Sequence, residues 1–157
     1  MSQTTTDSQT SLQITRTYRA TREQVFRAWT NPDALKKWFG PSDDFKTPAA
    51  EVDLRVGGTF RIQMIAPNGE SHAVGGIYKE ISSPEKLVFT WIWEEGVSCD
   101  GGPPEPPVET LVTVEFFVRG HETEVVLTHE RFPNVGSRDK HNEGWAGCLG
   151  RLEQGIS

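Results

Sequence analysis

A chain of 157 residues has the usual size of one domain and leaves little room for a second. Hydrophobic residues make up 35% of it and charged residues 24%, which is ordinary for a globular protein and excludes a wholly disordered chain. The formal net charge of −6 removes the electrostatic basis of general nucleic-acid binding, so we expect no nucleic-acid partner.

The N-terminal segment predicts neither a signal peptide nor a folded element. Residues 1–11 carry no apolar side chain after Met1, so we expect a disordered tail followed by a single domain over residues 12–157. No run approaches the roughly 18 to 20 apolar residues that a membrane span needs. Cys99 and Cys148 form no C-x-x-C pair, which together with the missing signal predicts a cytoplasmic location.

The first part of the domain predicts one strand and two short helices. Apolar residues alternate over residues 12–18, which indicates the strand. Thr21 and Gln24 then form a capping-box pattern that begins a helix. Asn31 is a good N-cap ahead of a proline, so a second helix is predicted over residues 32–38.

From Glu51 to Glu130 the apolar residues recur with a period of two, which is typical of strands. Turn residues divide this region into strands predicted over residues 59–65, 71–81, 86–93, 110–119 and 123–131. The stretch from Glu94 to Pro107 contains GGPPEPP and is predicted to be a long loop, because proline lacks the amide that a sheet requires.

The last segment returns to helical spacing, with Ser137 as the expected cap. Its apolar stripe consists of Trp145, Cys148, Leu149, Leu152 and Ile156. Gly144 borders this stripe, and close approach to another element or to a ligand would justify its cost in a helix. The order of elements predicts an α+β fold in which a long C-terminal helix covers one face of an antiparallel sheet.

The bulky side chains of the strands alternate onto one face, which leaves two interpretations open. In the first, these residues only fill the space between sheet and helix. In the second, a curved sheet and one helix enclose an apolar pocket that includes a few polar groups, with His129 as the best candidate because it shares a face with Leu127.

Six short motifs, spread in order between about Leu12 and Leu152, resemble the activator of heat-shock-protein-90 ATPase homologue-like family of the START-like (SRPBCC) superfamily. The motifs are Trp38-Phe39-Gly40-Pro41, Gly57-Gly58-x-Phe60, Gly76-x-Tyr78-x-Glu80-Ile81, the run from Pro84 to Trp91, Leu127-Thr128-His129-Glu130 and Gly144-Trp145. The resemblance implies the helix-grip fold: a curved antiparallel sheet around the C-terminal helix, two short helices after the first strand, and a cavity between sheet and helix.

The resemblance also implies which residues line that cavity, with two of them near its mouth. They are Trp38 and Phe39 at the mouth, and Phe60, Met64, Phe89, Trp91, Trp93, Phe116, His129 and Trp145 within. The leading hypothesis is a protein that binds a hydrophobic or aromatic small molecule there, without a cofactor.

Two alternatives stay open at this point. One is a cyclase- or hydrolase-type enzyme that uses the same cavity, with His129 as general acid or base. The other is a regulator of a heat-shock-protein-90-type ATPase, as the family name suggests.

The four histidines show no metal-ligand spacing and no nucleophile or phosphate-binding motif is present, so no metal site is expected. A homodimer is compatible with such a domain.

Overall fold

The computed structural model describes residues 10–40, 44–94 and 108–156. The predicted tail lies outside these residues except at its end. Nearly all of the predicted loop from Glu94 to Pro107, with Cys99, also lies outside them. Within the described ranges, no helix is both long and apolar enough to cross a membrane.

The first strand and the two short helices are confirmed, with one shifted boundary. They are β1 (Ser11–Tyr18), α1 (Arg22–Thr30) and α2 (Pro32–Trp38). The Thr21 side chain accepts a hydrogen bond from the Gln24 amide at 3.1 Å, and the Gln24 side chain accepts one from the Thr21 amide at 2.9 Å. Ser11, which the sequence assigned to the tail, is the first residue of β1 because it pairs with Glu130.

Seven antiparallel strands form one sheet in the order β1-β7-β6-β5-β4-β3-β2. The strands after the short helices are β2 (Lys46–Val52), β3 (Thr59–Ile65), β4 (Ser71–Ser82), β5 (Lys86–Trp93), β6 (Thr110–Arg119) and β7 (Glu122–Glu130). β2 begins five residues before the alternation that the sequence shows from Glu51. It lies at the sheet edge and its register shifts between Lys46 and Ala49, so it lacks a clean period of two.

Two glycines in β4 allow the sheet to bend sharply. A Cβ atom on Gly76 would lie 1.9 Å from the carbonyl oxygen of Thr90 in β5, and one on Gly75 would lie 2.7 Å from that of Phe60 in β3. The Thr90 hydroxyl accepts a hydrogen bond from the Ile77 amide at 2.8 Å, and the β4–β5 register shifts just beyond this point. The backbones therefore approach more closely here than side chains would permit.

The C-terminal segment forms α3 (Val135–Arg151) and the short α4 (Glu153–Ile156). The predicted cap is wrong: Asn134 caps α3, and its side chain accepts a hydrogen bond from the Ser137 amide at 2.7 Å. Close approach to another element does not explain Gly144, because a Cβ there would meet no atom of the described residues within 4 Å.

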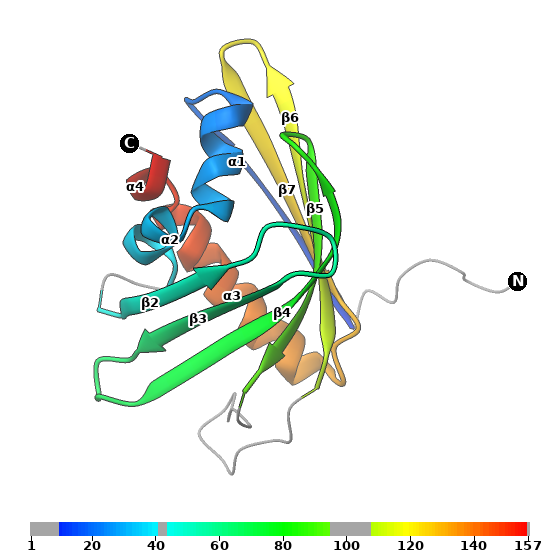
Figure 1. The fold of residues 1–157 in the computed structure, drawn as a ribbon. Coiled ribbons are helices and arrows are strands. Elements are labelled where there is room, and N and C mark those ends of the chain that lie inside the picture. The colour runs from blue at the N-terminus through cyan, green and yellow to red at the C-terminus, as the bar shows by residue number, and fades with distance from the viewer. Residues whose placement is uncertain (1–9, 41–43, 95–107, 157) are drawn as a thin grey trace, which may run out of the picture.

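The sheet wraps around α3, and α1 and α2 lie beside the C-terminal part of that helix (Figure 1). The predicted stripe is buried at Trp145, Cys148, Leu149 and Leu152, while Ile156 packs against the core from a half-buried position. This arrangement confirms the helix-grip architecture. The core occupies the concave side of the sheet, where all the helices meet it.

Gly144 provides a test of helix energetics. We expect Gly144→Ala to raise the unfolding free energy by about 1 kcal/mol, because alanine loses less backbone entropy in a helix and its methyl group meets open space. Urea unfolding followed by circular dichroism measures the change. An unchanged or lower midpoint would contradict this assignment.

Gly76 should respond in the opposite direction. Gly76→Ala places a methyl group on the Thr90 carbonyl, so we expect the unfolding free energy to fall by about 2 to 4 kcal/mol. The same unfolding measurement applies, with Gly69→Ala as a strained control in which the new methyl group meets no atom. A smaller loss for Gly76→Ala than for this control would show that the close approach is not a constraint.

Candidate functional site

A small cavity lies between the sheet and the pair α1–α2. Its volume is about 20 Å³, which gives room for about one water molecule. The lining comes from both layers and consists of Trp29, Leu35, Phe39, Phe60, Ile62, Tyr78, Phe89 and Trp91. Four of the residues expected from the resemblance are among them: Phe39, Phe60, Phe89 and Trp91.

The position and the size of this cavity both differ from the expectation. No residue of α3 is part of the lining, so the space lies under the short helices and not against the C-terminal helix. An open pocket large enough for a ligand is not confirmed. The physical reason is that Trp29 of α1 and Phe39 after α2 are buried among the side chains on the concave side and occupy part of this space.

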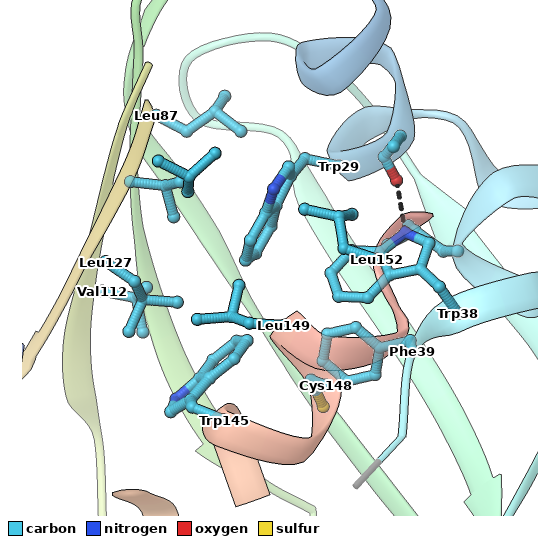
Figure 2. Packing of buried hydrophobic residues seen from close by; sticks show 14 of the residues in the cluster. Trp29, Trp38, Phe39, Leu87, Val112, Leu127, Trp145, Cys148, Leu149 and Leu152 are labelled. Carbon is cyan, nitrogen blue, oxygen red and sulfur yellow. Dashed lines mark hydrogen bonds between the residues drawn. The ribbon is translucent and has the colours of Figure 1, made fainter. Parts of the chain in front are cut away.

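Several aromatic rings pack together in this part of the core. Figure 2 shows Trp29, Trp38 and Phe39 gathered around Leu149 and Leu152 of the C-terminal segment. The ring centroids of Trp29 and Trp38 are 4.9 Å apart, and the ring planes are inclined at 67°. Such edge-on contacts stabilise the packing beyond the area that they bury.

Trp38 is fully buried, so it does not lie at a mouth as the resemblance implied. Its indole N–H donates to the Ala28 carbonyl at 2.8 Å, and its own carbonyl accepts from the Arg151 guanidinium at 3.0 Å (Figure 2 draws the first bond). A Cβ on Gly155 would lie 2.1 Å from the Trp38 ring. Trp38 therefore joins α1, α2 and α4 and does not open toward solvent.

Three further predicted residues lie outside the lining. Met64 is buried on β3, and Phe116 packs against Phe26 of α1 with ring centroids 5.5 Å apart. Trp93 is half-buried near the end of β5, where its indole N–H donates to His141 at 3.1 Å. These residues belong to the surrounding core.

His129 lies at the centre of a buried hydrogen-bond chain. The indole N–H of Trp145 donates to its Nδ1 at 3.0 Å, and its Nε2 lies 2.6 Å from the Thr110 hydroxyl. That hydroxyl donates in turn to the Trp91 carbonyl at 3.1 Å. Because an indole can only donate, Nδ1 must accept, and these partners assign the proton of the neutral ring to Nε2.

His141 has the opposite tautomer for the same reason. Its Nε2 accepts from the indole of Trp93, so its Nδ1 carries the proton and donates to the Ser137 carbonyl at 2.8 Å. The His129 and His141 rings are 5.3 Å apart. The sequence did not indicate that these two histidines lie side by side, because 11 residues separate them along the chain.

Both imidazoles are held neutral. Burial lowers the pKa of His129 well below its usual value, and repulsion from His141 lowers it further. Burial also lowers the pKa of His141, against an opposing effect of its bond to Ser137. With both nitrogens of His129 bonded inside the core, the ring offers no free nitrogen to a substrate. The geometry gives no support to His129 as a general acid or base.

Two buried donors at the cavity have no partner. Among the residues that the structure describes, the indole N–H groups of Trp29 and Trp91 make no hydrogen bond. Tyr78 also lines the cavity, and its burial raises the pKa of its hydroxyl.

Sequence reasoning missed Trp29, Leu35, Ile62 and Tyr78 as lining residues. Ile62 does alternate with Phe60, and Tyr78 lies in one of the six motifs, so part of the signal was present.

The buried histidines predict a pH dependence of stability. A histidine whose pKa is lowered by folding stabilises the native state above its unfolded pKa of about 6.5, and this contribution falls as the pH decreases below that value. We expect the unfolding free energy to decrease below about pH 6.5. His141→Gln should reduce the slope of the unfolding free energy against pH by up to about 1.4 kcal/mol per pH unit.

Urea unfolding at several pH values between 5 and 8 measures this slope. His121→Gln is the matched control, because His121 is exposed in the turn between β6 and β7. Equal slopes in the wild type and in His141→Gln would show that this ring is not held neutral.

The comparisons with known proteins agree with the fold. A structure from Nitrosomonas europaea matches with a TM-score of 0.76 and 26% identity, covering 98% of this chain and 97% of that chain. One from Chromobacterium violaceum matches with a TM-score of 0.76 and 27% identity, covering 91% and 94%. An AHSA1 protein from Silicibacter pomeroyi matches with a TM-score of 0.75 and 23% identity, covering 90% and 94%.

No curated protein matches the chain. The sequence profile described as "Activator of Hsp90 ATPase homolog 1-like protein" matches residues 19–156, from the end of β1 to the end of α4. Since this match spans most of the chain and the structure has the helix-grip architecture, the chain belongs to the AHSA1 family of activator of Hsp90 ATPase homolog 1-like proteins, within the START-like superfamily.

Proposed function

We propose that this protein binds a small, predominantly apolar or aromatic molecule between the sheet and the pair α1–α2. The observation that carries the proposal is the cavity, which is surrounded by aromatic and aliphatic side chains from two separate layers. Binding sites of this kind are concave and mostly apolar, with a few polar groups that orient the ligand.

The composition of the lining favours an uncharged ligand. Among the described residues, the cavity wall contains no carboxylate, no cationic side chain and no histidine. A charged group entering this space would lose its hydration without gaining an opposite charge, and that loss is costly. An apolar molecule gains from leaving water and from contact with the rings.

Binding requires the two layers to separate, because about 20 Å³ is far less than the volume of an aromatic ring. Leu35 lies on the seven-residue helix α2 and Phe39 directly follows it, whereas Phe60, Ile62 and Phe89 lie on the strands opposite. An outward shift of α2 would therefore enlarge the cavity while the sheet keeps its hydrogen bonds.

The test is a titration of the protein with α-methylstyrene. Nuclear magnetic resonance spectra monitor the titration through the amide and indole resonances. We expect saturable shifts at the lining residues. Ile62→Phe should weaken binding at least tenfold, because the larger side chain fills the cavity from β3. Thermal unfolding first establishes that this variant folds.

Ile77→Phe is the matched control. The same substitution is made at an exposed position of β4 outside the lining, so affinity should stay within about twofold of the wild type. If the wild type shows no saturable shift up to the solubility limit of the probe, or if both variants bind equally well, the proposed site is wrong.

A further inference from the structure

Building on the proposed function, we infer that the ligand carries a neutral hydrogen-bond acceptor, such as a ketone, ester or ether oxygen, that bonds to the indole N–H groups of Trp29 and Trp91. The inference adds a polar requirement to an apolar site. It rests on how the five tryptophans of the chain divide.

Three tryptophans satisfy their N–H groups within the protein. Trp38 donates to the Ala28 carbonyl at 2.8 Å, Trp93 to His141 at 3.1 Å and Trp145 to His129 at 3.0 Å. None of these three lines the cavity. This part of the core therefore follows the general rule that buried donors are paired.

The two remaining tryptophans are the two that line the cavity. Trp29 and Trp91 are each 4% exposed, and the Nε1 atom of each is buried without a partner among the described residues. A buried donor without an acceptor is unfavourable, and native proteins keep few of them. Both residues that carry these unpaired donors line one cavity, which indicates that their acceptor comes from outside the chain.

The chemistry of the donors defines the acceptor. An indole N–H can donate but cannot accept, so the partner must offer a lone pair. The lining provides no cation to accompany a carboxylate or a phosphate, which leaves a neutral oxygen or nitrogen as the partner. Tyr78, on the same wall, can donate to this acceptor as well. A neutral aromatic carbonyl compound satisfies every one of these requirements.

Two probes of nearly identical shape test the inference. Acetophenone has a carbonyl oxygen where α-methylstyrene has a methylene group, so a difference in affinity reports the hydrogen bond and not the packing. We expect acetophenone to bind at least fivefold more tightly, as one net hydrogen bond implies. It should also shift the indole proton of Trp29, of Trp91 or of both downfield, which α-methylstyrene should not do.

Substitutions identify the donor. Trp29→Phe and Trp91→Phe keep an aromatic ring in the wall but remove the N–H, so at least one of them should abolish the preference for acetophenone while α-methylstyrene still binds. Trp93→Phe is the matched control, since its N–H belongs to His141 outside the cavity, and it should retain the full preference. Thermal unfolding of all three variants verifies that they fold.

The outcomes separate the two proposals. Equal affinity for both probes, or a preference that survives in both Trp29→Phe and Trp91→Phe, overturns the inference and leaves the proposed function standing. Indole resonances of Trp29 and Trp91 that stay fixed when acetophenone binds show that a trapped water is their permanent partner, and this also overturns it. Binding of neither probe overturns the proposed function and the inference with it.

Discussion

The close approach of β4 to its neighbours at Gly75 and Gly76 is the constraint on which the rest of the fold depends. Because a backbone oxygen occupies the place of each missing Cβ, the strand bends where other residues would hold it straight. The bend allows the sheet to surround α3 on its concave side (Figure 1). That concavity is wide enough to admit rings from α1 and α2, and the small cavity lies where those rings meet the strands.

Local chemistry made most of the fold predictable. The capping box at Thr21, the cap at Asn31 and the alternation in β6 and β7 each act over a few residues, and each is confirmed. The errors occur where the deciding contact is distant or ambiguous. Ser11 joins β1 because Glu130 is its partner, and Asn134 caps α3 although Ser137 is an equally good cap in sequence.

The site was less predictable because it depends on volumes and on hydrogen-bond partners. Alternation places Phe60, Phe89 and Trp91 on the inner face, but it cannot show that Trp29 reaches the same space from a helix. The sequence also left His129 open as a catalytic candidate. Both of its ring nitrogens are hydrogen-bonded and the ring is neutral because of Trp145 and Thr110, which lie 16 and 19 residues away along the chain. The role of His129 therefore depends on its hydrogen-bond partners in the folded structure, which its neighbours in the sequence do not reveal.

The environment of Cys148 has a consequence for following motion in this fold. Its sulfur accepts a hydrogen bond from the Gly40 amide at 3.4 Å, and burial raises the pKa of the thiol to about 12. The thiolate is the form that attacks thiol reagents, so at neutral pH the protonated and buried Cys148 is unreactive. Reaction must wait until the segment after α2 separates from α3. The rate at which the Cys148 sulfur is alkylated therefore measures how often this contact between Gly40 and α3 opens, without any introduced label.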